Sequence, residues 1–286
     1  MKIAVAGANG WLGSKIVFEA VRKYGRDNVL CLHRPHADLT RLQKLVPEAL
    51  RETTDHQFEA LNNFRPDAVI CTICSYKTQT EYITESIDAN YAYPAKLLID
   101  AQSTHCPVFI SISTSLPPDL NLYAFTKSQF SLLGHFLAKQ GKISFISFRC
   151  EAIYGPDEPG DRFIPMVISK LRKHEPLNLT KGIQHRDFVW INDVVDALLF
   201  CSEIPETVKR YLEISMGSGL APEIREIVTF LKTHLESRSE LRFGAVPMRK
   251  NEPDLCADLT LLQSLGYRRT PLTWKQGLLK LIEKEC

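Results

Sequence analysis

The sequence lacks a long uninterrupted apolar run and carries little net charge. No apolar run approaches the roughly 20 residues needed to cross a membrane, so we expect no membrane-spanning segment. The formal net charge is +2, without a basic block or a stripe of basic and aromatic residues, which argues against a nucleic-acid partner but not against a small anionic substrate. Because a strand-like run begins directly after Lys2, we expect no signal peptide and a cytoplasmic protein.

The cysteines also lack the spacing of a zinc site. They are scattered and mostly lie in apolar runs, where cysteines usually act as small buried hydrophobes in a reducing compartment. Cys71 and Cys74 form a C-x-x-C pair, but they belong to a strand-like run and no second pair follows at ligand spacing. We therefore predict no metal site.

The chain begins with a short apolar run, residues 3–6, followed by a glycine-rich turn and an amphipathic helical pattern. Gly7, Gly10 and Gly13 have the spacing G-x-x-G-x-x-G. Glycines let the backbone turn sharply and approach a pyrophosphate, which the N–H groups of the next helix can bind. The pattern predicts a nucleotide-binding turn; a purely structural strand-to-helix turn is the alternative.

Strand-like runs alternate with helical patterns along the first half of the chain. Residues 28–32, 67–74 and 107–115 predict buried strands, whereas no strand is assigned between residues 35 and 66. This alternation predicts an α/β fold with a doubly wound parallel sheet and helices on both faces. The carboxyl ends of the strands then meet at one edge, where ligands of such sheets bind.

The residue at the end of the second predicted strand distinguishes the two nicotinamide cofactors. An acid there binds the ribose hydroxyls of NAD, whereas an arginine can pair with the 2′-phosphate of NADP. This chain has no acid at that place and carries His33 and Arg34. The pattern favours NADP(H); a solvated arginine at a strand end is the alternative.

A tyrosine and a lysine four residues apart follow the last of these strands. On a helix, Tyr123 and Lys127 lie on one face. A nearby ammonium lowers the pKa of a phenol from its usual value of about 10, so the tyrosine can transfer the proton that accompanies hydride transfer at a carbonyl. The hydroxyl of Thr114 would bind the same oxygen, with Ser113 or Ser115 as possible replacements. These residues predict a carbonyl reductase site.

The order of these motifs resembles the extended short-chain dehydrogenase/reductases of the NAD-dependent epimerase/dehydratase family. Further landmarks are a strand ending in Tyr154-Gly-Pro, the segment Arg186-Asp-Phe-Val-Trp, and the late segment 249–252. The resemblance covers essentially the whole chain and implies a Rossmann-type fold with a smaller mixed α/β C-terminal lobe. It maps the catalytic triad to Thr114, Tyr123 and Lys127.

The resemblance also implies which residues bind ligands. Arg186 and Arg249 match positions where the family clamps a nucleotide-sugar diphosphate, and two converging arginines suit a pyrophosphate; either could instead form an ordinary surface ion pair. The candidate substrate-binding residues are Tyr76, Ser115, Arg186 and Arg249. The candidate cofactor-binding residues are Gly7, Asn9, Gly10, Trp11, Leu12, Gly13, His33, Arg34, Thr72, Cys74, Tyr123 and Lys127.

Two departures from the family pattern bear on the reaction. The connection between Thr114 and Tyr123 is shorter than is usual in the family, so part of the cover of the sugar site is missing. Ser115 and Leu116 follow Thr114 where the family's 4,6-dehydratases carry Asp-Glu, which disfavours dehydration.

A closer resemblance is to 4-ketoreductases of the CDP-abequose and CDP-paratose synthase type, in residues 143–145, 155–165, 184–188 and 243–252. It implies NADPH-dependent reduction of the 4-keto group of a nucleotide-linked deoxysugar, with CDP as the expected nucleotide, in deoxysugar and surface-polysaccharide (O-antigen) biosynthesis. The alternatives are a nucleotide-sugar 4-epimerase with tightly bound NAD and a non-catalytic NADP-binding sensor.

Family architecture further implies two lobes and a homodimer. We expect residues 1–154, with about 185–215, to form the NADP-binding Rossmann domain, and about 155–184 with 216–286 to form the substrate lobe. Helical patterns lie at residues 162–171 and 220–231, the second with Pro222 in its first turn. The helical patterns at residues 87–101 and 124–138 fall where the family forms its dimer interface.

Overall fold

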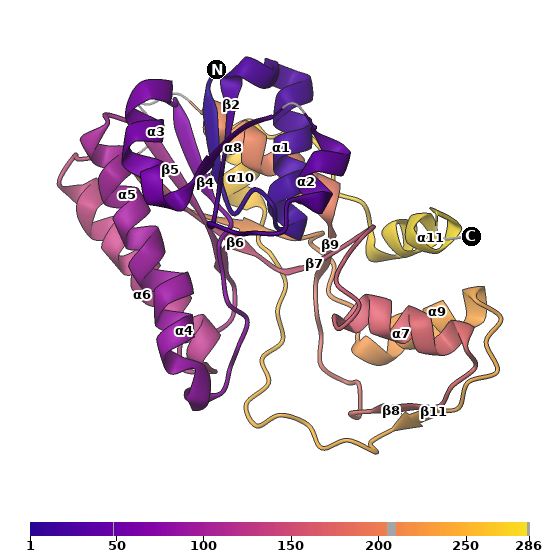
Figure 1. Cartoon of the computed structure of the whole chain (residues 1–286). Coiled ribbons are helices and arrows are strands. Elements are labelled where there is room, and N and C mark those ends of the chain that lie inside the picture. The colour runs from indigo at the N-terminus through magenta and orange to yellow at the C-terminus, as the bar shows by residue number, and fades with distance from the viewer. Residues whose placement is uncertain (48, 205–209, 285–286) are drawn as a thin grey trace. The chain divides into compact units, whose positions relative to one another are not determined.

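The structure, a computed structural model, describes residues 1–47, 49–204 and 210–284 (Figure 1). It divides into two compact units. The first comprises Met1–Arg149 and Val195–Ile214, and the second comprises Cys150–Val194 and Ser215–Cys286. Helix α8 (Ile191–Glu203) and strand β10 (Tyr211–Met216) each contribute residues to both units. None of the described helices is long and apolar enough to cross a membrane.

Most of a seven-stranded sheet belongs to the first unit, with the order β10-β6-β5-β4-β1-β2-β3. Strand β1 pairs in parallel with both β2 and β4, β2 pairs in parallel with β3, and β4 pairs in parallel with β5. The predicted α/β fold with a doubly wound parallel sheet is confirmed. Besides β10, the strands of this sheet are β1 (Ile3–Ala6), β2 (Val29–His33), β3 (Leu50–Thr53), β4 (Ala68–Cys71), β5 (Val108–Thr114) and β6 (Ser144–Cys150).

Strand β3 lies in the stretch where the sequence assigned no strand. It occupies the edge of the sheet, and its residues alternate between exposed and half-buried. Such a strand lacks the continuous apolar run of a strand that is buried on both faces. The four residues of β1, in contrast, are all buried, which is why its pattern was recognisable.

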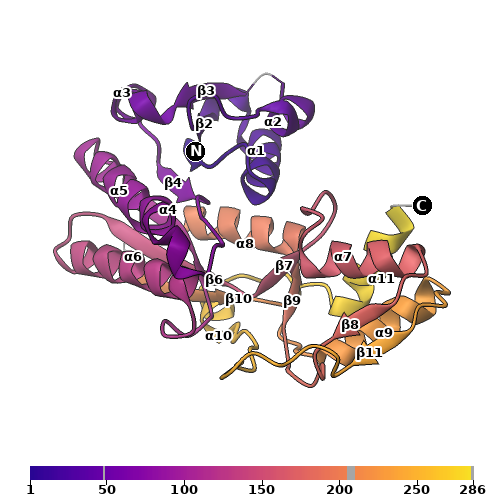
Figure 2. The same cartoon turned by 60° about the horizontal axis from the view of Figure 1, so that its bottom comes forward.

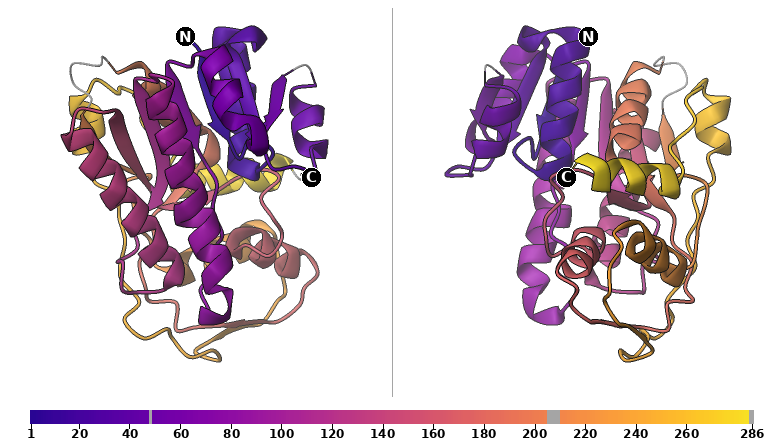
Figure 3. Two further views of the ribbon diagram at one scale, coloured as in Figure 1. Left: turned by 60° about the vertical axis from the view of Figure 1, so that its left-hand side comes forward. Right: turned by 90° about the vertical axis from the view of Figure 1, so that its right-hand side faces the viewer.

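Helices cover both faces of this sheet. Figure 3 shows α5 and α6 side by side on one face, with α1 on the opposite face. A π-helical turn joins α4 to α5, so these two short helices form one continuous rod. The bounds are α1 (Trp11–Tyr24), α2 (Thr40–Leu45), α3 (Gln57–Phe64), α4 (Ile83–Ile87), the π-turn (Asp88–Ala92), α5 (Tyr93–Ser103) and α6 (Leu122–Lys139).

Within its described residues, the second unit contains two small parallel strand pairs, the start of α8 and further helices (Figure 2). Strand β7 (Ala152–Tyr154) pairs with β9 (Phe188–Trp190), and β8 (Leu177–Leu179) pairs with β11 (Leu241–Phe243). Helices α7 and α9 pack together over the second pair. The helices are α7 (Phe163–Arg172), α9 (Ile224–His234), α10 (Thr260–Ser264) and α11 (Trp274–Lys284).

The expectation that Pro222 lies inside the first turn of its helix is wrong. Helix α9 begins at Ile224, so Pro222 precedes it. The Glu226 carboxylate accepts a hydrogen bond from the Glu223 backbone N–H at 2.9 Å, which satisfies one N–H at the start of the helix.

The core of the second unit joins its C-terminal helix to β7. The ring of Tyr154 is fully buried and packs edge-on against Trp190, with ring centroids 5.6 Å apart. Its hydroxyl donates to the carbonyl of Trp274 at 3.3 Å. A Cβ atom on Gly277 would overlap this hydroxyl. The absence of a side chain at Gly277 therefore lets α11 pack directly against Tyr154.

We expect Gly277→Ala to lower the free energy of unfolding by about 1–3 kcal/mol, the usual cost of an overpacked core. Helix propensity alone would favour alanine by about 1 kcal/mol, so the sign of the change tests the packing. Chemical denaturation provides the measurement. Gly160→Ala is the matched control, because its Cβ would meet no atom within 4 Å. A stabilised Gly277→Ala variant would contradict this account of the core.

Candidate functional site

The glycine-rich turn of the first unit is closely packed. Gly7 has φ +79°, a conformation that L side chains rarely adopt, and its Cβ would lie 2.6 Å from Thr72 Oγ1. A Cβ on Gly13 would overlap the carbonyl oxygen of Gly7. The hydroxyl of Thr72 donates to the carbonyl of Ala6 at 3.0 Å and thereby ties the end of β4 to the turn. These contacts require glycine at Gly7 and Gly13.

The start of α1 fits the pyrophosphate of a dinucleotide. The helix begins at Trp11, its N-cap residue Gly10 has no side chain, and its first turn contains no acid. The positive end of the helix dipole suits an anion at this place. A Cβ on Gly10 would lie 3.1 Å from the carbonyl oxygen of Gly7, within the space of the turn.

The remaining candidate cofactor residues surround this turn. Asn9 donates through Nδ2 to the carbonyl of Asp38 at 3.2 Å, which fixes the segment after β2. Nδ1 of the His33 ring lies 3.0 Å from the Arg34 carbonyl oxygen. The Arg34 side chain is exposed, whereas Leu12 and Cys74 are half-buried.

Arg34 lies within electrostatic reach of a carboxylate on α4. The pKa of Glu85 is lowered, chiefly by its hydrogen bond from Lys77 and to a smaller extent by the charge of Arg34. The Lys77 ammonium lies 2.7 Å from the Glu85 carboxylate. The end of β2 is thus adjacent to a small cluster of exposed charges.

The two chemistry-bearing side chains lie in the first turns of α6. Asn121 caps this helix by accepting a hydrogen bond from the Ala124 N–H at 2.9 Å, so Tyr123 occupies the first turn and Lys127 the second. Lys127 is 3% exposed, and its ammonium donates to the carbonyls of Ile73 at 3.1 Å and Ile112 at 2.8 Å. Because an ammonium has three N–H groups, one of them stays available to a ligand.

Tyr123 is partly exposed and packs against a second tyrosine. The rings of Tyr76 and Tyr123 have centroids 5.0 Å apart with planes tilted by 32°. Thr114 ends β5, two residues after the carbonyl that binds Lys127, and its Oγ1 accepts from the Leu116 N–H at 3.2 Å. The structure therefore gathers Tyr76, Thr114, Tyr123 and Lys127 at the carboxyl ends of β4 and β5.

The alternative hydroxyls differ in their surroundings. Ser113 is buried and lies 3.3 Å from Ser131, so its hydroxyl belongs to the interface between β5 and α6. The carbonyl oxygen of Ser115 accepts from Arg149 at 3.5 Å. Of the two alternatives, Ser113 is committed to the core.

The sequence reasoning missed Asn90, which holds the Ser75 segment in place. Its side chain is fully buried in the π-turn. The Asn90 amide accepts from the Ser75 N–H at 2.8 Å and donates to the Ser75 carbonyl and the Thr126 hydroxyl, both at 3.0 Å. The sequence shows only an asparagine within a helical pattern, whereas its burial and the hydrogen-bond partners that a buried amide needs are seen in the structure. Asn90 joins the residue before Tyr76 to the residue before Lys127.

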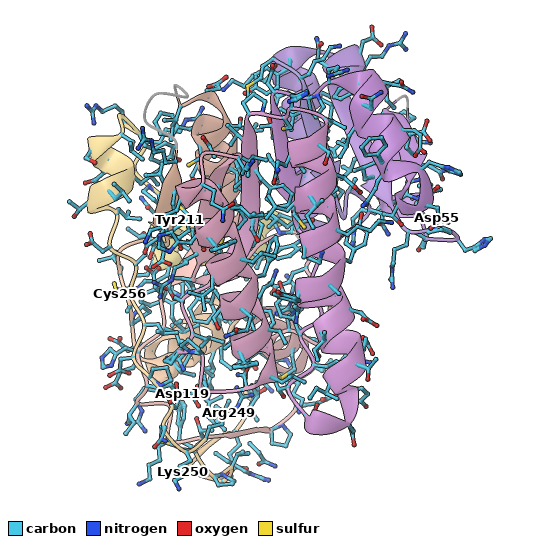
Figure 4. All side chains as sticks on the ribbon, turned by 90° about the vertical axis from the view of Figure 1, so that its left-hand side faces the viewer. Asp55, Asp119, Tyr211, Arg249, Lys250 and Cys256 are labelled. Atoms are coloured by element: carbon cyan, nitrogen blue, oxygen red, sulfur yellow. The ribbon has the colours of Figure 1, made fainter. Side chains whose placement is uncertain are left out.

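The two arginines assigned to a diphosphate both belong to the second unit. The Arg186 guanidinium forms an ion pair with Glu252 at 2.6 Å, and the side chains of both residues are 14% exposed. Arg249 is exposed on the segment after β11, and Figure 4 labels it beside Lys250 on that segment.

The glycine-rich turn at residues 216–219 binds a carboxylate of the chain itself. Asp187 is fully buried and accepts from the Ser218 N–H at 2.7 Å, the Ser218 hydroxyl at 2.6 Å and the Gly219 N–H at 3.0 Å. The Ala257 N–H donates to the same carboxylate at 3.1 Å. This turn therefore supports the fold. No group of three or more His, Cys, Asp and Glu side chains within residues 1–47, 49–204 and 210–284 could hold a metal ion.

Comparison with known sequences gives one family and several relatives. The sequence model of the "NAD dependent epimerase/dehydratase family" matches residues 3–217. The chain is similar to CDP-abequose synthase of Salmonella typhimurium, with 29% identity across 99% of this chain and 97% of that protein. It is also similar to CDP-abequose synthase of Salmonella muenchen, with 24% identity across 93% of this chain and 92% of that protein.

The fold is shared with a solved enzyme structure. UDP-glucuronic acid 4-epimerase from Bacillus cereus, in complex with UDP-glucuronic acid and NAD, superposes with a TM-score of 0.85. The two chains are 21% identical and the match covers 100% of each. At this identity the comparison supports the Rossmann-type architecture.

The loop after Tyr154-Gly-Pro contains a carboxyl group with an altered pKa. Burial raises the pKa of Glu158 from 4.5 to about 8, although the charge of Arg162 acts in the opposite direction. Glu158 Oε2 is buried, and no described residue forms a hydrogen bond with it. The folded state therefore favours the neutral acid.

We expect the stability of the wild type to fall relative to Glu158→Gln as the pH rises from about 4.5 to about 8. The pKa of Glu158 is higher in the folded state than in the unfolded state. Its contribution to the free energy of unfolding is therefore complete below the unfolded-state pKa and is lost as the pH rises through the folded-state pKa. Urea denaturation of both proteins between pH 5 and 9 provides the measurement. Glu240→Gln is the control, because Arg242 lowers the pKa of that exposed acid. A pH-independent difference would contradict the assignment.

Proposed function

The chain belongs to the NAD dependent epimerase/dehydratase family and is an oxidoreductase-type enzyme that uses a nicotinamide cofactor, and on that basis we propose that it reduces the 4-keto group of a nucleotide-linked deoxysugar with NADPH. The observation that carries the proposal is the buried Lys127 ammonium, held by two carbonyls one helical turn beyond Tyr123. The similarity to CDP-abequose synthases supports CDP as the nucleotide and deoxysugar biosynthesis for a surface polysaccharide as the role.

In this proposal, each candidate residue has a distinct task. The nicotinamide supplies the hydride when it is bound. The Lys127 ammonium stabilises the phenolate of Tyr123, so that Tyr123 can donate its proton to the keto oxygen and regain one afterwards. The Thr114 hydroxyl orients the keto oxygen, and the exposed Tyr76 ring borders the place where the sugar binds.

NADPH is proposed over NADH because of Arg34. The end of β2 carries this exposed arginine and no acid, and an arginine can pair with a 2′-phosphate. The first unit would then hold the cofactor, and Arg186 and Arg249 of the second unit would bind the diphosphate of the substrate.

A homodimer is proposed from the apolar surface of the first unit. Leu132 and Phe136 are 59% and 58% exposed on α6, and Phe125 on the same helix is 50% exposed. Ile99 on α5 is also exposed. Large exposed apolar groups on neighbouring helices indicate an interaction surface, and a second copy could cover it with the same helices.

We expect the purified enzyme to oxidise NADPH with one nucleotide class among CDP-, dTDP-, UDP- and GDP-linked 4-keto-6-deoxysugars, and to oxidise NADH more slowly. Tyr123→Phe should lower kcat by a factor of about 10²–10⁴, because it removes the proton donor. The matched control is Tyr24→Phe, which changes a tyrosine at the opposite end of α1 from the glycine-rich turn, where its hydroxyl donates to Glu203 at 2.8 Å. Absorbance at the NADPH band gives the rates.

Three outcomes would overturn the proposal. Full turnover by Tyr123→Phe would remove the assigned acid. Absence of NADPH oxidation with every substrate, together with NAD(H) retained through purification, would indicate the 4-epimerase, and binding of NADP(H) without any turnover would indicate the sensor.

We expect the wild type to sediment as a dimer and Leu132→Glu and Phe136→Glu to sediment as monomers, because a buried unpaired carboxylate opposes association. Ile183→Glu changes an exposed isoleucine of the second unit and serves as the control. Analytical ultracentrifugation provides the measurement. A monomeric wild type, or dimeric variants at both positions, would contradict the assigned surface.

A further inference from the structure

The segment after β11 crosses the second unit without regular structure. We call residues 244–257 the strap. Its first part is tied to β8, because the N–H groups of Gly244 and Val246 each donate to the Leu179 carbonyl at 3.0 Å. Its last part is tied to the stretch before β9: Leu255 donates to the His185 carbonyl at 3.3 Å, and Ala257 donates to the Asp187 carboxylate at 3.1 Å.

The strongest tie is made by side chains. Arg186 donates through Nη2 to Glu252 at 2.6 Å, and through Nη1 to the carbonyls of Pro253 and His185. Both side chains of the pair are largely buried, at 14% exposure. A charge-assisted hydrogen bond that is shielded from water in this way is stronger than an exposed pair. Glu252 therefore fixes the orientation of the Arg186 guanidinium.

Between its two anchored ends, the strap contains an exposed span with two cationic side chains. Within the described residues, Pro247–Asn251 form no hydrogen bond or ion pair with the rest of the unit, and Arg249 and Lys250 are exposed (Figure 4). Asn251 has φ 57° and forms a turn with Lys250. A turn of this kind brings its first residue, Arg249, close in space to its last residue, Glu252. The position of Arg249 thus depends on the anchoring of Glu252.

Arg186 keeps donors for a ligand despite these bonds. A guanidinium has five N–H groups, and the three hydrogen bonds above use both Nη1 donors and one Nη2 donor. Nε–H and the second Nη2–H make no hydrogen bond within the described part of the chain, and such a pair can bind a phosphate group. A hydrogen bond from the His185 N–H and, to a smaller extent, the charge of Arg186 lower the pKa of Asp254, so this carboxylate also belongs to the cluster. Three cations and two carboxylates give a net charge of about +1, which suits an anionic ligand such as a diphosphate.

We propose that Glu252 is a positioning residue of the diphosphate site. It holds the guanidinium of Arg186 in one orientation and anchors the strap so that Arg249 stays near it. The carboxylate itself does not touch the phosphates. This inference rests on the proposed function, because it takes a nucleoside diphosphate as the ligand. It adds that both arginines depend on Glu252, an acid of the landmark segment 249–252 to which the resemblance assigned no role.

The test uses CDP and UDP as probes, with the full-length wild type, Glu252→Ala and Glu252→Gln. Calorimetry gives the Kd for each nucleotide. Trypsin cleavage at Arg249 and Lys250, read by mass spectrometry, reports on the strap directly. Glu240→Ala is the matched control, because Glu240 is an exposed acid of the same unit that pairs with Arg242 at 2.7 Å. Unfolding temperature and NADPH binding show whether each variant is folded.

We expect the nucleotide that binds to slow cleavage of the wild-type strap. Glu252→Ala should be cleaved about tenfold faster and bind the nucleotide about tenfold more weakly, as expected for loss of a charge-assisted hydrogen bond. Glu252→Gln should lie between the two, because its amide oxygen still accepts from Nη2. With a ketosugar substrate, KM should rise in Glu252→Ala while kcat stays within about twofold, since the reacting groups are unchanged.

The failures of the two proposals can be told apart. If the wild type binds CDP or UDP and Glu252→Ala binds it equally well with the same cleavage rate, the positioning role is wrong and the proposed function stands. If the wild type binds neither CDP nor UDP, the inference is wrong, and NADPH oxidation with the four classes of ketosugar decides separately whether the proposed function also fails. If Glu252→Ala does not fold, Glu252→Gln decides, and an unchanged Kd and cleavage rate in that variant would overturn the positioning role.

Discussion

The buried ammonium of Lys127 is the constraint on which the first unit depends. Moving a cation out of water is costly, and two backbone carbonyls at the ends of neighbouring strands offset that cost. The same two bonds lock the start of α6 against β4 and β5. Tyr123, one turn earlier on that helix, is consequently held at the edge of the sheet where a ligand can reach it. A structural requirement and a chemical one are met by one side chain.

Other hydrogen bonds near Lys127 also hold this edge of the sheet in place. Asn90 binds both Ser75 and Thr126, and the hydroxyl of Thr72 binds the turn after β1. Each bond joins the carboxyl end of a strand to a helix or turn that would otherwise move independently. The edge of the sheet is therefore rigid where cofactor and substrate are proposed to bind, and rigid support of this kind favours precise placement of reacting groups.

Features that depend on residues close together in the sequence could be predicted from it, whereas features that depend on partners far along the chain could not. The glycine turn, the buried strands and the Tyr123–Lys127 spacing are local, and the structure has the expected elements at those places. Strand β3 was missed because its alternating edge pattern resembles a polar loop. The ion pair of Arg186 with Glu252 joins residues 66 positions apart, and no local pattern identifies such a partner. The same holds for the bonds of Asn90.

The π-turn between α4 and α5 has a consequence for the exposed surface of this rod. In an uninterrupted α-helix, Ile99 would lie about 120° around the axis from Ile87, because each residue advances by about 100°. A π-turn absorbs roughly one extra residue, which reduces that angle to about 20°. The exposed isoleucines on either side of the turn consequently share one face, while Asn90 stays on the buried one. The π-turn thus acts as a phase correction, because the same residues wound as an uninterrupted α-helix would place Ile87 and Ile99 on different faces.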